Sequence, residues 1–183
     1  MSTATKLLTA QEYALLPDDG TPTELVRGEV IEMSSPYPRH GQICSQIVYL
    51  LRRFQEVKPL GHVVSNDSGV ITERDPDTVR GPDVAFYSFS RVAPGPFPSE
   101  QYLVAVPELI FEVRSPSDRW REVIEKVNEF LQAGVGVVCV VDDATKEVRV
   151  FDETGIHGFS ADEELSFPSV LPGFRVPVRR LFE

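Results

Sequence analysis

The sequence predicts a mixed α/β fold whose central sheet contains both parallel and antiparallel strands. Its most informative stretch, residues 107–143, reads as a strand, a helix and a second strand. The nearly unbroken apolar run at 109–113 is typical of a strand covered on both faces. Two strands connected through a helix lie parallel in one sheet. Hairpin patterns elsewhere in the chain add antiparallel strands, which makes the predicted sheet mixed.

A helix is predicted directly after the first of these strands. In the segment 115–118, Ser115 is placed to cap the helix, Pro116 suits its first position, and Asp118 completes a capping box. Apolar residues then recur at helical spacing over 120–131, so one helix face is expected to pack on the sheet. Gly134 is placed to end the helix. The run 137–141 is the second buried strand.

Glu112 interrupts the apolar strand, and Lys126 is a candidate partner for it. Lys126 lies about ten residues into the predicted helix, which runs back along the sheet. The standard rises of helix and strand place the two residues within about 5 Å in height, which a lysine side chain can span. On a helical wheel Lys126 lies at the edge of the apolar stripe, so its side chain could point toward the strand or toward water. An exposed lysine and an acid at a strand edge are the ordinary alternative.

The N-terminal part of the chain predicts two helices and a hairpin. Thr9 opens a capping box for a short helix that continues to Leu16. Residues 24–33 read as a hairpin with Gly28 at the turn. A longer helix is expected from His40, with apolar residues at helical spacing as far as Phe54.

Three further strands are predicted. Residues 62–72 alternate like one strand, and residues 81–87 form a short apolar one. The segment 147–151 is expected to pair with 137–141 as a hairpin. A long loop, 88–99, is rich in proline. The apolar residues of the tail, 171–181, are expected to dock against the domain or a neighbouring subunit.

Length and composition suggest one domain spanning residues 1–183. No signal peptide or membrane span is visible, so a soluble, cytoplasmic protein without a membrane partner is expected. Cys44 and Cys139 are interpreted as buried thiols. The net charge of -10 argues against nucleic-acid binding through bulk electrostatics. Residues 36–58 are more basic, however, and a polyanion could approach there if cations neutralised an acidic pocket.

Several polar residues have an ordinary interpretation when each is taken alone. Glu24 on a strand would usually face solvent. Asp83, which follows Pro82 at the start of a strand, could simply bond to turn backbone. His40 near a helix N-terminus could contact a phosphate or satisfy a turn.

Taken together, the acids follow an order that resembles a known signature. Pro82-Asp83 on one strand precedes Glu112-Val113-Arg114 on the next, which is similar to the PD-(D/E)XK signature of restriction-endonuclease-like nucleases. More closely, the chain resembles the Uma-two family of this superfamily, formerly a domain of unknown function. The resemblance covers a core of about residues 9–151 and leaves a tail at 152–183. It is carried by the segments TELVRGEVIEMS, RHG, GPDVAF and ELIFEVRSPSD and by the helix with Lys126.

The resemblance implies a restriction-endonuclease-like fold, with a central mixed sheet flanked by helices, and a metal-dependent endonuclease that hydrolyses phosphodiester bonds of nucleic acid, with DNA favoured over RNA as the substrate. It assigns catalytic roles to Glu24, Asp83, Glu112 and Lys126, the lysine having moved from the strand to the following helix. Mg²⁺, with Mn²⁺ as a substitute, would be held by Asp83, Glu112 and the Val113 carbonyl. Glu24 would complete the metal shell directly or through water.

Two further residues are candidate substrate contacts, His40 and Arg114. Arg114 occupies the usual lysine position of the signature, where it would act as a supporting or DNA-contacting cation. A homodimer is implied because such nucleases often act on two strands. One alternative is a catalytically inactive nuclease fold that serves as a binding or regulatory module. Another is an unrelated hydrolase with paired carboxylates, such as a glycosidase, against which the single tryptophan argues.

Overall fold

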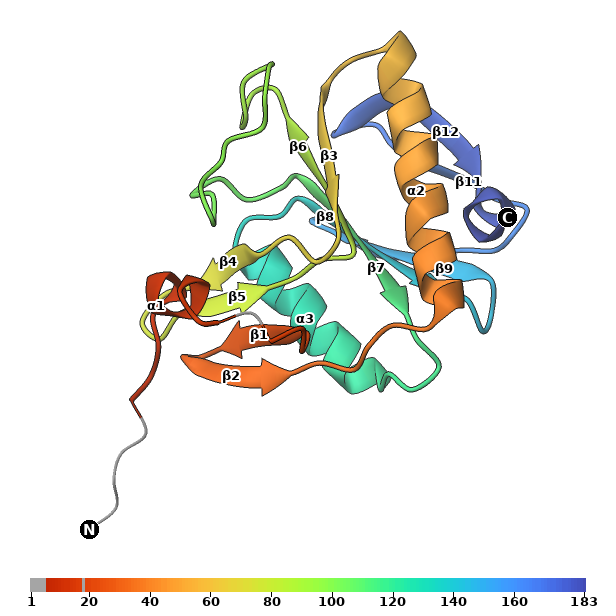
Figure 1. The fold of residues 1–183 in the computed structure, drawn as a ribbon. Coiled ribbons are helices and arrows are strands. Elements are labelled where there is room, and N and C mark those ends of the chain that lie inside the picture. The colour runs from red at the N-terminus through yellow and green to blue at the C-terminus, as the bar shows by residue number, and fades with distance from the viewer. Residues whose placement is uncertain (1–5, 18) are drawn as a thin grey trace.

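The computed structural model describes residues 6–17 and 19–183, and its centre is a six-stranded sheet (Figure 1). The strand order is β10-β9-β8-β7-β6-β3. Strands β7 and β8 are parallel and the other neighbours are antiparallel, so the predicted mixed sheet is confirmed. The bounds are β3 Gly61–Ser65, β6 Val84–Ser88, β7 Leu109–Arg114, β8 Val137–Asp142, β9 Glu147–Asp152 and β10 Gly155–Phe159.

Two helices cover opposite faces of this sheet, α2 (Pro38–Val57) and α3 (Trp120–Gln132) (Figure 1). The alternation of strand residues decides which side chain meets which helix. In β8, Cys139 and Val141 share a buried cluster with Ile43 of α2, whereas Val138 and Val140 share one with α3. The α3 side chains at the centre of that second cluster are Val127 and Phe130, both fully buried. The central strands are therefore covered on both faces, as their apolar runs predict.

A second sheet of four strands lies beside α3, in the order β2-β1-β5-β4 (Figure 1). Its strands are β1 Thr23–Val26, β2 Glu29–Glu32, β4 Val70–Glu73 and β5 Thr78–Arg80. The short helix α1 (Ala10–Ala14) packs on it through Ala10, which contacts Leu25 and Val79 in a small core. The predicted hairpin and the capping box of Thr9 are both confirmed.

The C-terminal segment forms a small antiparallel pair, β11 (Glu164–Phe167) and β12 (Leu171–Pro177), followed by the 3-10 helix η1 (Val178–Phe182). Its apolar side chains are buried in the cluster on the α2 side of the central sheet. The tail is expected to dock against the domain or against a neighbouring subunit, and in the structure it docks against the domain.

The predicted single strand over 62–72 is wrong. The chain forms β3 and β4 instead, which belong to different sheets. Asn66 and Asp67 between them adopt left-handed backbone conformations, with φ of 69° and 52°. Such residues end a strand and turn the chain, and Asn and Asp tolerate this conformation better than most residues.

The predicted start of α3 is also wrong, because the helix begins at Trp120. One bond of the expected capping box is present, but together with a backbone bond it closes a turn instead. The Ser115 amide donates to the Asp118 carboxylate at 2.7 Å, and the Asp118 amide donates to the Ser115 carbonyl at 3.0 Å. Arg119 then takes an extended conformation before the helix begins. At the other end Gly134, with φ of 98°, follows the helix as predicted. Helix α2 begins at Pro38, two residues before the expected start at His40.

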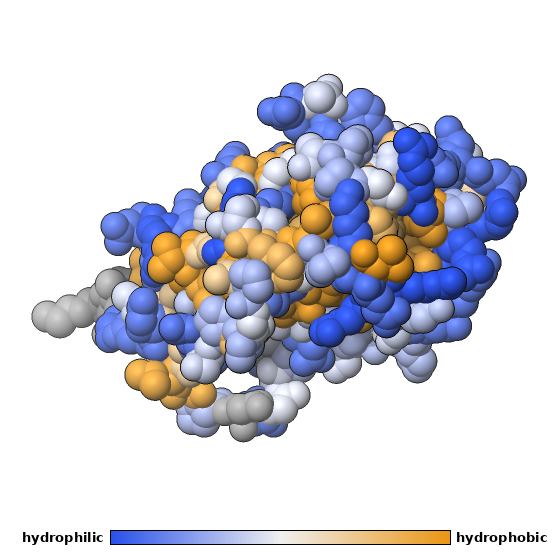
Figure 2. All heavy atoms as spheres, turned by 90° about the horizontal axis from the view of Figure 1, so that it is seen from above, coloured by the Kyte–Doolittle hydropathy of each residue, from blue (hydrophilic) through white to orange (hydrophobic). Residues whose placement is uncertain are grey.

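Within 6–17 and 19–183, no helix combines the length and apolarity needed to cross a bilayer. Viewed from above, hydrophobic side chains form a central band bordered by polar ones (Figure 2). The most exposed large hydrophobic side chains are Val57, at the end of α2, and Val104, in the connection between β6 and β7.

Candidate active site

The structure brings Glu24, Glu112 and Lys126 into direct contact. The Nζ atom of Lys126 lies 3.0 Å from Oε2 of Glu112 and 3.2 Å from Oε1 of Glu24. It also donates to the carbonyl of Gly81 at 2.9 Å. The lysine thus points toward the strands and not toward water, and the predicted contact between Glu112 and Lys126 is confirmed. The ammonium group thus lies against two carboxylates and one backbone carbonyl.

The alternation of β7 explains why Glu112 faces Lys126. Phe111 and Val113 lie in the cluster on the α2 face of the sheet, whereas Ile110 lies in the cluster on the α3 face. Successive side chains in a strand point to opposite faces, so Glu112 shares the α3 face with Ile110. Lys126 approaches from α3 on that same face.

Asp83 lies just before β6 and is fixed to the end of β7. Its Oδ2 accepts a hydrogen bond from the Val113 amide at 2.6 Å, and its Oδ1 lies 3.2 Å from Nε2 of His40. In a strand, the N–H and C=O of one residue point to the same side. The Val113 carbonyl is therefore directed to the side of β7 on which Asp83 lies.

The buried charges perturb one another strongly. Burial raises the pKa of Glu112 to about 8, even though Lys126 opposes this shift. Burial would lower the pKa of Lys126, but Glu112, Glu24 and Asp83 outweigh it and raise that pKa above its ordinary value. The Glu112 Oε1 atom is buried and has no hydrogen-bond partner. Glu112 is thus the least satisfied acid of the cluster.

Glu24 is held by more donors than the sequence suggested. Burial would raise the pKa of Glu24, but Lys126 and Arg80 outweigh it, so the pKa lies below its ordinary value. Its Oε2 accepts from Arg80 at 2.8 Å, and its Oε1 accepts from the Gly81 amide at 2.9 Å. Arg80 also makes two hydrogen bonds to Glu129 of α3, at 2.6 and 2.8 Å. Sequence reasoning missed Arg80, whose only signal was a charge close to Pro82-Asp83.

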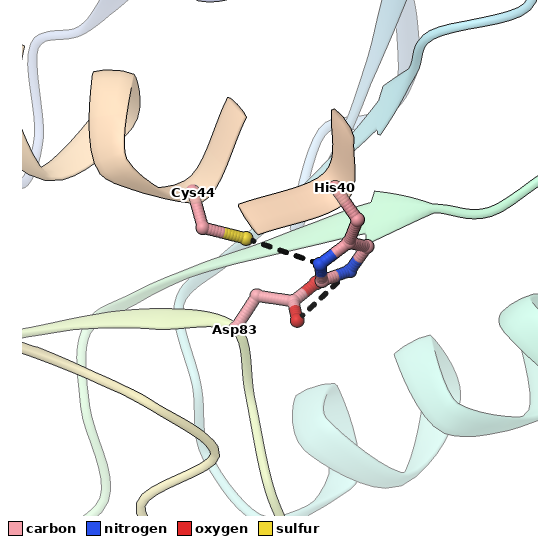
Figure 3. Close-up of side chains that lie close together, drawn as sticks. All are labelled: His40, Cys44 and Asp83. Carbon is pink, nitrogen blue, oxygen red and sulfur yellow. Dashed lines mark hydrogen bonds and ion pairs between the residues drawn. The ribbon is translucent and has the colours of Figure 1, made fainter. Parts of the chain in front are cut away.

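His40 reaches the cluster from the N-terminal turn of α2 (Figure 3). Its Nε2 faces Asp83, and its Nδ1 lies 3.5 Å from the Sγ atom of Cys44. Hydrogen bonds to Asp83 and Cys44 raise the pKa of His40 to about 10, so its ring is charged at neutral pH. Cys44 is half-buried, which agrees only in part with the expected buried thiol, whereas Cys139 is fully buried.

Asp67 is a further acid near the cluster that sequence reasoning missed. Asp67 lies in the turn between β3 and β4. It is close to Gly81, since a Cβ atom added to Gly81 would lie 2.9 Å from the Cβ atom of Asp67. Burial and the charge of Asp83 raise the pKa of Asp67. No sequence pattern groups Asp67 with the other acids, because its position depends on that turn.

Arg114, the other candidate substrate contact, is not part of the acid and lysine cluster. Its guanidinium lies 3.2 Å from the carboxylate of Asp142 and 5.1 Å from the centre of the Trp120 ring. Arg114 borders two cavities, however, together with Val113. A cavity of about 270 Å³ is lined by Glu24, Glu112 and Lys126, and a second of about 380 Å³ is lined by His40.

A mixed sheet between two helices, with two acids and a lysine gathered at the end of its parallel strand pair, defines the class of restriction-endonuclease-like proteins. The chain belongs to the Uma2 family, described as "Putative restriction endonuclease", whose model matches residues 10–179.

A solved structure with the same fold comes from Anabaena variabilis and is titled "a putative nuclease belonging to DUF820". It superposes with a TM-score of 0.81 at 19% sequence identity, over 96% of this chain and 97% of that one. No curated protein matches the chain at a significant level. The family description points to a nuclease. The shared fold of the solved structure confirms the predicted fold class.

Proposed function

We propose that the protein is a Mg²⁺-dependent endonuclease that hydrolyses phosphodiester bonds of DNA, with Asp83, Glu112 and Lys126 as its catalytic residues. The observation that carries this proposal is the unsatisfied Glu112 carboxylate beside Lys126 and Asp83. These groups come from three separate parts of the fold. Asp83 precedes β6, Glu112 lies in β7 and Lys126 lies in α3. Buried charges are costly to a fold unless they are paired, so such an arrangement is typical of a functional site.

The residues present fit a divalent cation. Oε1 of Glu112 is buried without a partner, and a cation would satisfy it and stabilise the ionised carboxylate. Asp83 adds carboxylate oxygens, and the Val113 carbonyl is directed to the same side of β7. Carboxylate and carbonyl oxygens are the donors that Mg²⁺ prefers, and Mn²⁺ accepts them too. The bound ion would polarise the scissile phosphate and lower the pKa of a water molecule.

Lys126 would act on the reacting groups once Glu112 turns to the cation. In the structure its ammonium group donates to the Gly81 carbonyl and forms ion pairs with Glu112 and Glu24. Loss of the Glu112 contact would free one donor for the attacking water or for a phosphate oxygen. The raised pKa of Lys126 keeps the ammonium charged, so it can stabilise negative charge that develops on the phosphate.

Glu24 and His40 would support this chemistry in different ways. Both carboxylate oxygens of Glu24 already accept hydrogen bonds, which favours a role in positioning Lys126 or in holding the cation through water. His40 is charged and lies beside Asp83 at the start of α2. It is therefore placed to contact a phosphate, and the partial positive charge of the helix N-terminus adds to this attraction.

The proposal is tested by cleavage assays on supercoiled plasmid, linear duplex and single-stranded DNA, and on RNA, with Mg²⁺ or Mn²⁺. Wild type should cleave DNA in the presence of either ion. Asp83→Ala and Glu112→Ala should abolish cleavage, and Lys126→Met should slow it by about 10²- to 10³-fold, as the loss of one electrostatic stabiliser does. Glu153→Gln is the matched control, since Glu153 is an exposed acid in the turn between β9 and β10.

Two results would contradict the proposal. Cleavage at the wild-type rate by folded Asp83→Ala or Glu112→Ala would remove the acids from the mechanism. A wild-type protein that binds neither Mn²⁺ nor Mg²⁺, with or without DNA, would favour the alternative of a nuclease fold that serves as a binding module. The expected homodimer stays a prediction that sedimentation of the DNA complex would test.

A further inference from the structure

Three side chains, one of them the proposed Mg²⁺ ligand Asp83, form a second set of metal donors (Figure 3). His40 and Cys44 are four residues apart on α2, a spacing that places both on one face of a helix. Asp83 faces them from the entry to β6. One donor atom from each residue can be chosen so that all three lie within 4.8 Å of one another.

We propose that His40, Cys44 and Asp83 form a Zn²⁺ site, and that Zn²⁺ bound there inhibits the enzyme by occupying Asp83. The zinc site itself follows from the donor geometry. Its inhibitory effect rests on the proposed function, because it requires Asp83 to serve the Mg²⁺-dependent reaction.

The chemistry of the donors distinguishes this set from the acid and lysine cluster. Mg²⁺ requires oxygen ligands, whereas imidazole nitrogen and thiolate sulfur are typical ligands of Zn²⁺. Cys44 and His40 therefore bias the set toward zinc. A water molecule or a phosphate oxygen would supply the fourth position.

The distances require only a small adjustment. With Zn–S bonds of about 2.3 Å and Zn–N or Zn–O bonds of about 2.0–2.2 Å, donor atoms around a tetrahedral ion lie about 3.3–3.6 Å apart. In the structure Sγ of Cys44 lies 3.5 Å from His40 Nδ1, and Asp83 Oδ1 lies 3.2 Å from Nε2 of the same ring. An ion uses one ring nitrogen, so the side chains of Asp83 or Cys44 would move by about 1 Å to meet it. The thiol proton and one imidazolium proton pass to solvent as the ion binds.

The site is both anchored and open to an ion. Helix α2 is fixed to the sheet by the buried side chains Ile43, Ile47 and Leu51, so the spacing of its two donors is rigid. His40 borders the cavity of about 380 Å³, and Cys44 is half-buried. An ion can therefore reach the donors without opening the core.

The binding test uses Zn²⁺ and its spectroscopic substitute Co²⁺ on the metal-free protein, without nucleic acid. Wild type should bind one Zn²⁺, and Co²⁺ should produce a thiolate-to-metal charge-transfer band. Cys44→Ser keeps a hydrogen-bond partner for His40 but removes the thiolate. Since even the loss of an outer partner costs about 10- to 100-fold in metal affinity, Cys44→Ser should lower Zn²⁺ affinity at least about tenfold and abolish the band. Cys139→Ala, at the other cysteine, should leave both unchanged.

An unchanged Zn²⁺ affinity in Cys44→Ser, or a charge-transfer band that depends on Cys139, would overturn the zinc site whatever the protein cleaves. The activity test follows separately. Zn²⁺ should inhibit Mg²⁺-dependent cleavage by wild type, and Cys44→Ser, with each protein measured relative to its own rate without Zn²⁺, should require at least about tenfold more Zn²⁺ for inhibition. Equal inhibition of both proteins would overturn the inhibitory role, whereas absence of cleavage by wild type would refute the proposed function and leave the zinc site standing.

Discussion

Glu112→Gln should stabilise the protein while it removes the proposed metal site. The substitution keeps the size of the side chain and eliminates its charge. Burial raises the pKa of Glu112 from 4.5 to about 8, which means that the folded protein holds this proton more tightly than the unfolded chain does. Stability therefore falls as pH rises from about 4.5 to about 8, because the unfolded chain gives up the proton first.

The size of the effect follows from the shift. Each pKa unit corresponds to about 1.4 kcal/mol, so ionising Glu112 costs the fold on the order of 3 kcal/mol at pH 7. Glutamine avoids this cost, although its buried amide loses about 1–3 kcal/mol if it lacks an acceptor. The pH dependence is the clearer signature. The free energy of unfolding of Glu112→Gln, relative to wild type, should increase by about 3 kcal/mol between pH 5 and pH 8.

Urea unfolding of both proteins at pH 5, 7 and 8, in the absence of divalent ions, measures this difference, with Glu153→Gln as the control. Added Mg²⁺ should then stabilise wild type at pH 8, by about 3 kcal/mol at a hundred times its Kd, and leave Glu112→Gln unchanged. A difference between the two proteins that does not vary with pH would refute the reasoning, since it would show that Glu112 ionises in the folded protein as it does in the unfolded chain.

Three other predictions follow from the same structure. Mg²⁺ affinity should rise about tenfold per pH unit up to about pH 8 and then level off, because the ion must displace the Glu112 proton. Calorimetry in buffers of different ionisation enthalpy should detect the release of that proton. Arg80→Leu should cost about 3–5 kcal/mol in denaturant unfolding, since it removes the cation that pairs with both Glu24 and Glu129 and leaves Lys126 as the counter-charge of Glu24; a loss below 1 kcal/mol, the size expected of an exposed pair, would contradict this. Gly61→Ala should cost about 1–3 kcal/mol in the same assay, because the new Cβ would lie 2.1 Å from the Tyr87 carbonyl oxygen, whereas Gly158→Ala meets nothing within 4 Å and should cost nothing.

The segment from β7 to β8 could be predicted from the sequence because its geometry is local. Apolar runs fix the strands, helical spacing fixes the buried face of α3, and the rise of each element places Lys126 beside Glu112. The error in the start of α3 is also local, since the same Ser115 and Asp118 pair that could cap a helix can close a turn.

The remaining parts of the site depend on contacts between distant segments. Arg80 joins Glu24 to Glu129 across three elements, and no periodicity in the sequence indicates such a link. Asp67 approaches the acids only because Asn66 and Asp67 turn the chain between two sheets. Cys44 did carry a usable signal, its position four residues after His40, but the partner Asp83 lies on another element. The single-domain boundary at 1–183 stays a prediction.

The alternation of β7 also makes the proposed site depend on the native register of the central sheet. A slip of one residue between β7 and its neighbours would turn Glu112 into the apolar layer under α2 and present Val113 to Lys126. The Asp83 carboxylate would lose the Val113 amide at the same time. A chain that mispairs its central strands thus lacks the arrangement proposed to cut DNA.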